Sequence, residues 1–307
     1  MRQQADVVVT VNGAASNSVA FARRAGSIYY IAPSGIDANP CTEQAPCATL
    51  QHVAAAVLRA GDTVLVRGGT YSESEVWIRG DRGQSGTPEA RKLLKAYPGE
   101  SVTYANAARP MILNADYITV SGLNFTNRKS LGNGSDEAGQ RVNWIINNTF
   151  RGSIGYEATG STGDDHVLAG NVCEVSGSSQ GTQGHCYYIS FGSNVQLLYN
   201  IGRGAPGYGI HVFDQRRRAG DFRRVISNIL IEGNTLTGST RRAGLIVTMG
   251  DEDRIGNTID GVTILNNTFG GNDQLGAVVG GNVRNVRMTG NAFVQIGRAS
   301  CRERVCT

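Results

Sequence analysis

The sequence has few prolines, few charged residues and no long apolar segment. Only 7 of its 307 residues are proline and 18% are charged, whereas 41 are glycine and 40% are hydrophobic. This composition can bury a core, which excludes an intrinsically disordered chain. No segment approaches the ~20 apolar residues of a transmembrane helix, and the first residues lack the apolar core of a signal peptide. The sequence therefore indicates an ordered, turn-rich protein without a membrane span.

The positive charges are too few and too scattered to indicate nucleic-acid binding. The net charge is +4 and no long basic tract is present. Neutralising a nucleic-acid backbone requires clustered lysines and arginines along one surface. We therefore do not expect a nucleic-acid partner.

One signal recurs along the chain: a short apolar segment that ends at an asparagine. The segments are rich in β-branched residues and bounded by glycine and asparagine, which is typical of strands. The asparagines are Asn124, Asn148, Asn171, Asn200, Asn234, Asn267 and Asn291, with spacings of 23 to 34 residues. Such a period marks a solenoid, and stacked asparagines at sharp bends can hydrogen-bond from coil to coil. The pattern predicts a parallel β-helix with three short strands per coil and longer spacings absorbed by loops.

The two ends of the chain do not follow this repeat. Residues 5–22 contain an alternating strand, an Asn12-Gly13 turn and a second strand. This segment resembles the last hairpin of an IPT/TIG immunoglobulin-like domain, so we expect residues 1–26 to be the remnant of an upstream domain and linker. The protein would then be secreted or located at the cell surface, with its signal peptide outside this chain.

The ending "IGRASCRERV" resembles a translated sequencing adapter, so we expect residues 296–307 to be non-native read-through. Residues 27–295 remain as the solenoid domain.

The segment "YYIAPSGIDANPCTEQAPCATLQHVAAAVLRAGDTVLVRGGTYSE" carries a family resemblance. From Tyr29 to Glu100 the chain resembles the start of right-handed parallel β-helix proteins of the pectate-lyase-like superfamily, and the coil repeat continues to about Val294. The resemblance implies an all-β fold, a right-handed parallel β-helix with an N-terminal capping helix. Apolar residues at helical spacing place that helix over residues 49–59, where it would cover the open end of the sheets. We expect a monomer.

Four cysteines lie in the solenoid region: Cys41, Cys47, Cys173 and Cys186. Cys41 and Cys47 flank a proline-containing loop and could close a small disulfide, which is consistent with secretion. A zinc site would need further cysteines or histidines nearby, and the sequence places none there.

A second strand follows each asparagine and carries the candidate site. Aligning these strands by position puts Glu157, Tyr188 and His211 in one outward row. The flanking inward columns are Tyr156, Tyr187, Ile210, Leu245 and Ala277, and Ala158, Ile189, Val212, Val247 and Val279. The insertion at residues 176–184 would bring His185 to the edge of this row. Phe213, Asp214 and Arg216 to Arg218 follow His211, and Arg242 approaches from the next coil.

The family resemblance implies cleavage of acidic polysaccharides by β-elimination. That reaction needs a positive charge on the uronate carboxylate, a base for the C5 proton and an acid for the leaving oxygen. We expect His211 or His185 as the base, Tyr188 as acid or base, and Arg216 among the carboxylate-neutralising arginines. Glu157, Phe213, Asp214, Arg218 and Arg242 would bind substrate. Alternatively, Arg216 to Arg218 only form surface ion pairs with the acidic residues 251–253 one coil away.

Three other readings stay open at this point. "GDDH" at Gly163–His166, followed by Gly184-His185 and Arg216–Arg218, is similar in order to polygalacturonase-type hydrolases, which would use Asp164 and Asp165 as paired carboxylates. The chain lacks the earlier aspartate motif of those enzymes. Calcium-assisted lyases use an aspartate cluster and a lysine base; no lysine follows Lys129, although Asp164 and Asp165 are a candidate Ca²⁺ site. A non-catalytic glycan-binding or structural solenoid is the third reading.

Overall fold

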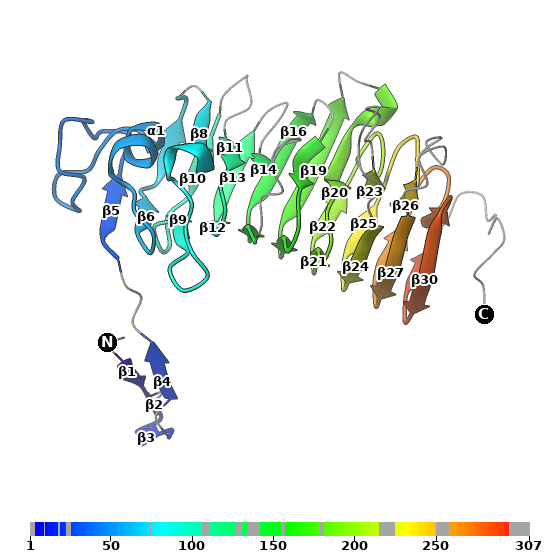
Figure 1. Cartoon of the computed structure of the whole chain (residues 1–307), viewed down its shortest axis with the longest axis horizontal. Helices are drawn as coiled ribbons and strands as arrows, with labels where there is room; N and C mark the ends of the chain where they lie inside the picture. Colours follow the sequence, from blue (N-terminus) through cyan, green and yellow to red (C-terminus); the bar gives the residue numbers. More distant parts are fainter. Residues whose placement is uncertain are drawn as a thin grey trace.

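The computed structural model describes residues 4–8, 10–17, 19–22, 26–73, 75–105, 111–126, 131–133, 142–154, 157–178, 181–214, 225–249 and 258–294. Three parallel sheets wind around one apolar interior (Figure 1), and each complete coil contributes one strand to each sheet. The predicted right-handed parallel β-helix is confirmed. Within the described part of the chain, no helix has the length and apolar character needed to cross a membrane.

The strands of each sheet are as follows. The ten-stranded sheet contains β5 (Ile28–Ile31), β6 (Thr63–Val66), β9 (Lys92–Ala96), β12 (Ile118–Ser121), β15 (Trp144–Ile146), β18 (Val167–Ala169), β21 (Gln196–Leu198), β24 (Val225–Glu232), β27 (Thr258–Leu265) and β30 (Val283–Thr289). The nine-stranded sheet contains β7 (Gly69–Tyr71), β10 (Val102–Tyr104), β13 (Leu123–Thr126), β16 (Thr149–Ile154), β19 (Val172–Ser178), β22 (Ile201–Arg203), β25 (Thr235–Thr237), β28 (Thr268–Gly270) and β31 (Ala292–Val294). The eight-stranded sheet contains β8 (Val76–Arg79), β11 (Met111–Asn114), β14 (Leu131–Asn133), β17 (Glu157–Thr162), β20 (His185–Phe191), β23 (Ile210–Asp214), β26 (Leu245–Met249) and β29 (Ala277–Gly280).

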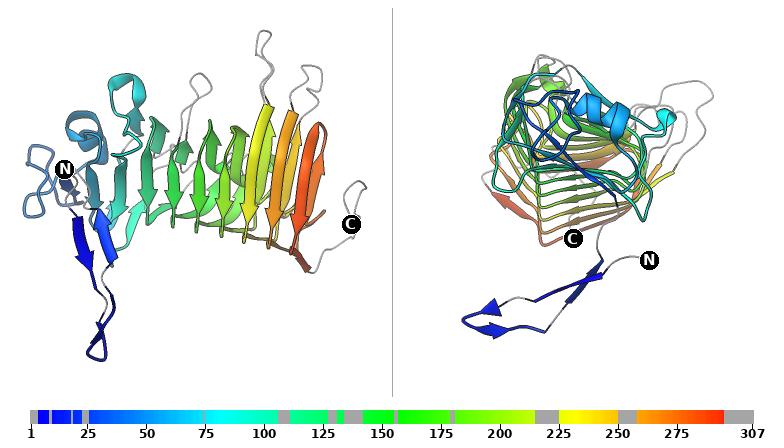
Figure 2. Two further views of the ribbon diagram at one scale, coloured as in Figure 1. Left: turned by 60° about the horizontal axis from the view of Figure 1, so that its bottom comes forward. Right: turned by 90° about the vertical axis from the view of Figure 1, so that its left-hand side faces the viewer.

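A helix covers the N-terminal end of the solenoid, as the apolar spacing predicts (Figure 2). It begins as α1 (Leu50–His52) and continues as a wider π-helical turn, η1 (Val53–Val57). The Thr49 hydroxyl accepts a hydrogen bond from the His52 backbone N–H at 3.2 Å, which satisfies a donor of the first turn. Leu50, Val53 and Ala54 are buried against the first coils. The helix therefore protects the end of the core from solvent.

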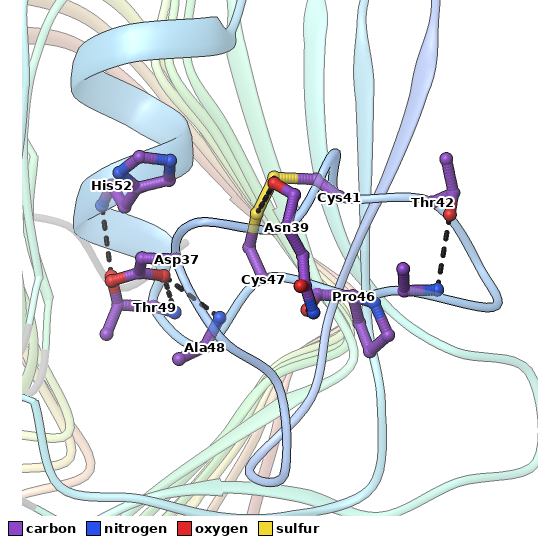
Figure 3. The surroundings of a disulfide bond; sticks show 10 residues. Asp37, Asn39, Cys41, Thr42, Pro46, Cys47, Ala48, Thr49 and His52 are labelled. Atoms are coloured by element: carbon purple, nitrogen blue, oxygen red, sulfur yellow. Dashed lines mark hydrogen bonds between the residues drawn. A yellow bond between two sulfur atoms is a disulfide. The ribbon is translucent and has the colours of Figure 1, made fainter.

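Two disulfides are present among the described residues. Cys41 and Cys47 are bonded, which confirms the predicted pair (Figure 3). The Asp37 carboxylate beside this loop accepts hydrogen bonds from the backbone N–H groups of Ala48 and Thr49, both at 2.9 Å. The second disulfide joins Cys173 of β19 to Cys186 of β20 in the interior. It was not predicted, because the two cysteines lie on different sheets at either end of the insertion.

The N-terminal segment forms two antiparallel pairs that belong to none of the three solenoid sheets. β1 (Gln4–Val7) pairs with β4 (Val19–Ala22), and β2 (Thr10–Val11) pairs with β3 (Ala14–Ala15). Asn12 and Gly13 have φ values of 50° and 83°, so the predicted turn is confirmed. Derivation from an IPT/TIG domain stays a prediction, and residues 296–307 lie outside the described residues.

Asparagine side chains form a continuous ladder at the corner between the ten-stranded and nine-stranded sheets. In each of six coils this corner consists of one left-handed residue, with φ of 54° to 68°, followed by an asparagine. The pairs are Asn147-Asn148, Gly170-Asn171, Tyr199-Asn200, Gly233-Asn234, Asn266-Asn267 and Gly290-Asn291. Each asparagine Oδ1 accepts a backbone N–H from the preceding coil at 2.8–3.0 Å. Each Nδ2 also donates to a backbone carbonyl of an earlier coil. The predicted stacking is confirmed for these six residues.

Asn124 does not belong to the ladder, so the prediction is wrong for this residue. The Leu123 N–H donates to Asn148 Oδ1 at 3.0 Å, so Leu123 takes the ladder position. Asn124 lies one residue later, inside β13, and its Nδ2 donates to the Val102 carbonyl at 3.0 Å. Ser121 pairs with Ile146 and Asn124 pairs with Thr149, so Gly122 and Leu123 occupy the same two corner positions as Asn147 and Asn148. The asparagine of this coil comes one position later in the sequence, inside the strand.

The core consists of columns of inward side chains that stack from coil to coil. Tyr71, Tyr104, Phe125 and Phe150 form one such column, with successive ring centroids 5.2, 5.9 and 5.3 Å apart. The predicted inward residues Tyr187, Ile189, Ile210, Val212, Leu245 and Val247 are all buried. Stacked rings of this kind contribute about 0.5–1.5 kcal/mol per pair beyond their buried area.

The predicted alignment of the coil at residues 155–159 is wrong by three residues. Thr159 pairs with Tyr187 and Gly160 pairs with Tyr188, whereas Glu157 pairs with His185. The strand reads "EATGST" and has no apolar alternation, so its sequence does not specify which residues face inward. Thr159 accordingly occupies the inward column and is fully buried. Tyr156 lies outside the described residues.

Candidate functional site

Two neighbouring strands of the eight-stranded sheet present the candidate site. Tyr188 of β20 pairs in register with His211 of β23, as predicted. Their neighbours in sequence point into the core, so the pleat turns Tyr188 and His211 outward. Both residues are half-buried on this outer face. Glu157 is not in this row, because its strand is shifted, and its side chain is not described.

Five rings, including that of His211, form a cluster. The His211 ring centroid lies 4.5 Å from that of His185, 4.9 Å from Tyr188, 4.9 Å from Tyr208 and 5.2 Å from Phe213. His185 also stacks on Tyr188 and Tyr208, with centroid distances of 5.7 and 5.5 Å and interplanar angles below 30°. The insertion therefore does bring His185 to the row. We call these five residues, His185, Tyr188, Tyr208, His211 and Phe213, the ring cluster.

Hydrogen bonds hold the two imidazoles in fixed positions. The Tyr208 backbone N–H donates to His185 Nδ1 at 3.0 Å. His185 Nε2 lies 3.1 Å from His211 Nδ1, which is a hydrogen-bonding distance. No other described residue is bonded to His211 Nε2, which leaves this atom available on the outer face.

Gly207 permits this arrangement. A Cβ atom at this position would lie 2.4 Å from His185 Nδ1 and 2.6 Å from the Thr182 carbonyl oxygen. The Gly207 N–H donates to the Gly184 carbonyl at 2.7 Å, which ties the turn before β23 to the end of the insertion. Only glycine lets the backbone approach the histidine ring so closely.

Burial and a nearby cation keep both histidines neutral. Burial lowers the pKa of His185 to about 3, with a smaller contribution from the Arg242 guanidinium. Burial also holds the pKa of His211 well below its usual range, and His185 and Arg242 add to this effect. Burial raises the pKa of Tyr208, while Arg242 opposes the rise through its charge and a hydrogen bond. Both imidazoles are therefore uncharged at neutral pH.

Arg242 is the predicted arginine that the structure places at the site. It lies half-buried in the loop before β26 and acts electrostatically on His185, His211 and Tyr208. Arg216 and Arg218 lie outside the described residues, and Asp214 ends β23 with a side chain that is not described. The acidic residues 251–253, which could have paired with these arginines, also lie outside the described residues.

Asp164 and Asp165 lie at a different corner of the coil. They follow the C-terminal end of β17, whereas His185 begins β20. Asp164 Oδ1 accepts the Ser193 N–H at 2.8 Å, and Ser193 lies eight residues beyond His185, or roughly 25 Å along an extended chain. Asp165 has a φ of 61° and accepts a hydrogen bond from Asn194 Nδ2 at 2.9 Å. Both aspartates therefore serve as turn residues that bind the next coil, away from the ring cluster.

The described residues offer one group with metal-ligand spacing: Cys41, Cys47 and His52. The prediction that no histidine lies near these two cysteines is therefore wrong. Its two sulfur atoms are joined in a disulfide and cannot act as thiolate ligands. Asp164 and Asp165 do not form such a group with further ligands in the described part of the chain.

Sequence reasoning missed Tyr208 and Gly207, although both stand beside His211 in "GYGIHVF". Tyr208 precedes the strand, so strand alternation gives no prediction for its direction. The repeated glycines of "PGYG" were the available signal, since glycine clusters mark places where a backbone approaches another group closely.

Solved structures with the same fold are known. The chain is similar to pectate lyase Pel9A, with a TM-score of 0.55, 15% sequence identity, and coverage of 86% of this chain and 79% of that one. It is also similar to XylC in complex with xylose, with a TM-score of 0.51, 12% identity, and coverage of 81% and 69%. At these identities the similarity shows that the chain shares the parallel β-helix fold of these proteins.

Sequence comparison gives one partial match. The chain is 34% identical over 94 residues to the uncharacterized protein YwoF of Bacillus subtilis (strain 168). The match covers 31% of this chain and 18% of that protein, so the chain spans less than a fifth of this relative. No family model matches the sequence.

Proposed function

We propose that this chain is a polysaccharide lyase that cleaves an acidic, uronate-containing polysaccharide by β-elimination. The observation that carries the proposal is the ring cluster with Arg242, displayed on the outer face of a parallel β-helix. Lyase chemistry needs proton-transferring groups beside a fixed positive charge. Tyr188, His211 and Arg242 supply these groups within one cluster.

Each group has a role in the proposal. Arg242 neutralises the uronate carboxylate, which acidifies the C5 proton. Tyr188 and His211, whose ring centroids lie 4.9 Å apart, handle proton transfer and stabilise the charge that develops on the sugar. Tyr208 and Phe213, which are half-buried beside His211, present flat surfaces to a sugar ring, whereas His185 is buried and contacts His211. Arg216, Arg218, Asp214 and Glu157 stay candidate substrate contacts.

Two features favour this reading over the alternatives. The paired carboxylates of a hydrolase would have to flank one bond, and Asp164 and Asp165 are bound to the next coil at another corner. The buried disulfides favour an oxidising compartment, which agrees with a secreted or cell-surface protein that meets extracellular glycans. A binding module without turnover is distinguished by the experiment below.

The test uses a panel of polygalacturonate, alginate and glycosaminoglycans, each with and without added Ca²⁺. Absorbance from the unsaturated product supports the lyase, and new reducing ends without that absorbance would support a hydrolase. Retention on immobilised polysaccharide without either product would support a binding module. The Ca²⁺ arm shows whether the reaction requires the ion.

Replacing His211 with Ala should lower kcat/KM by at least about 100-fold, the usual contribution of one proton-transferring or charge-stabilising group. His52→Ala is the matched control, because His52 lies in the capping helix and should leave turnover unchanged. Circular dichroism and thermal melting of both variants establish that they are folded. An unchanged rate in His211→Ala would remove His211 from the site.

A further inference from the structure

The proton positions on the two imidazoles follow from a backbone group. A peptide N–H can only donate a hydrogen bond, and the Tyr208 N–H points at His185 Nδ1 over 3.0 Å. His185 Nδ1 must therefore present its lone pair. A neutral imidazole carries its single proton on the other nitrogen, so His185 bears the proton on Nε2.

The same logic passes to His211. The proton on His185 Nε2 is directed at His211 Nδ1, which lies 3.1 Å away. His211 Nδ1 therefore accepts this hydrogen bond and carries no proton. The remaining proton of neutral His211 lies on Nε2, the atom left available on the outer face.

The described groups around His211 disfavour its protonation. A proton on Nδ1 would meet the proton that His185 already donates there. The described groups that face His211 are His185 and Tyr188 of β20, Tyr208 in the preceding turn, Phe213 of its own strand, Arg242 and, in the next coil, Ile246. None of these described neighbours is a carboxylate that would favour an imidazolium, and Arg242 disfavours one.

We infer that His211 is a neutral hydrogen-bond donor through Nε2, and that the Tyr208 backbone amide sets this state through His185, a positioning residue. What the donor binds rests on the proposed function. In that reaction Nε2–H donates to an oxygen of the uronate carboxylate, next to the charge of Arg242, and stabilises the negative charge that develops there when the C5 proton leaves. His211 has no lone pair free to serve as the base, which narrows the earlier expectation for this residue.

Tyr188 is then the proposed proton carrier. Its hydroxyl oxygen is buried in the structure, so this role requires the hydroxyl to turn toward the substrate and to be deprotonated before the step. The phenolate oxygen takes the proton from C5, and the electron pair of that bond forms the C4–C5 double bond. The C4–O bond breaks, its electrons leave with the sugar oxygen, and Tyr188 returns the proton to that oxygen. The step conserves protons and electrons without a further reactant.

The first arm of the test does not depend on catalysis. In ¹⁵N-labelled protein, the imidazole chemical shifts of His185 and His211 are assigned from the His185→Ala and His211→Ala variants. Both residues should show an unprotonated Nδ1 and a protonated Nε2, without titration between pH 5 and pH 8. In His185→Ala, His211 should lose the fixed tautomer and titrate closer to the ordinary histidine pKa of about 6.5. A protonated Nδ1 on His211 in the wild type, or its titration in this range, would overturn the inference.

The second arm uses His211→Gln, whose side-chain amide keeps a donor near the Nε2 position but is not a base. A donor role predicts that His211→Gln stays within about tenfold of wild type, while His211→Ala loses the about 10²–10³-fold typical of a missing transition-state donor. Equal losses in both variants, with both folded, would overturn the donor role. If the wild type cleaves none of the polysaccharides, the proposed function fails while the ¹⁵N arm still decides the tautomer. His52→Gln serves as the folding control.

Discussion

Replacing Asn200 with Ala should destabilise the solenoid far more than the same change at Asn124. Asn200 is fully buried, and its Oδ1 accepts from the Asn171 N–H and Nδ2 at 3.0 and 2.9 Å. Its Nδ2 donates to the Leu168 carbonyl at 2.8 Å and to Asn234 Oδ1 at 3.0 Å. The truncation therefore leaves the buried Asn171 N–H without its partner and removes a second hydrogen bond from the Leu168 carbonyl, which lies in a paired strand. At about 1–3 kcal/mol for the unpaired N–H and about 1 kcal/mol for the lost bond, we expect a loss of about 2–4 kcal/mol in the free energy of unfolding.

Asn124 is the matched control because it has the same sequence signature without the ladder position. Its Nδ2 makes one bond to the Val102 carbonyl and a longer, exposed one to Ser101 Oγ. Asn124→Ala should cost below about 1 kcal/mol, as expected for a half-exposed position. Urea unfolding followed by far-ultraviolet circular dichroism, at one protein concentration, measures both values. Equal losses, or a loss below about 1 kcal/mol for Asn200→Ala, would refute the role assigned to the ladder.

Two further predictions concern Gly207 at the site and the buried Lys92 of β9. Gly207→Ala should displace His185 and break its bond to the Tyr208 N–H, lowering the free energy of unfolding by about 2–4 kcal/mol through overpacking and an unpaired donor. Gly280→Ala, where a Cβ meets nothing within 4 Å, should stay within about 0.5 kcal/mol in the same urea assay, and similar losses in the two variants would contradict the steric account. Burial lowers the pKa of Lys92 to about 8; the charge of Asp62 opposes this shift and the charge of Arg59 adds to it. Above pH 8 the unfolded chain therefore binds more protons than the folded chain. The free energy of unfolding should therefore rise between about pH 8 and 10 by at most about 3 kcal/mol relative to Lys92→Met, and a parallel pH dependence of the two proteins would show that Lys92 is charged in the fold.

Much of the fold could be predicted because the same contacts repeat from one coil to the next. An asparagine at a two-residue corner is visible in sequence, and the apolar pairs Tyr187 with Ile189 and Ile210 with Val212 fix which residues point inward. The same alternation correctly predicted that Tyr188 and His211 point outward. It failed at β17, where glycine, serine and threonine leave the pairing of Glu157 unspecified.

The details of the site depend on turns, which alternation does not describe. Tyr208 reaches His211 from a turn between sheets, and the tautomer of His185 depends on a backbone N–H whose direction only the folded chain defines. The Cys173–Cys186 bond likewise joins two different sheets. Arg242 could be named from sequence, but its effect on the histidines follows from the loop that holds it near them.

The corners of the coil differ in how freely their length can vary. At the asparagine corner, an added residue would move the left-handed position and the asparagine out of line with both neighbouring coils. Asn124, which stands one position past this corner, has no place in the ladder. At the corner that carries Tyr208 and Arg242, successive coils already differ in length, and the three sheets continue unchanged on either side. Loops at this second corner can be lengthened or exchanged without disturbing the asparagine ladder. New contacts to a ligand can therefore be introduced beside the ring cluster, while the asparagine corner keeps the spacing between coils constant.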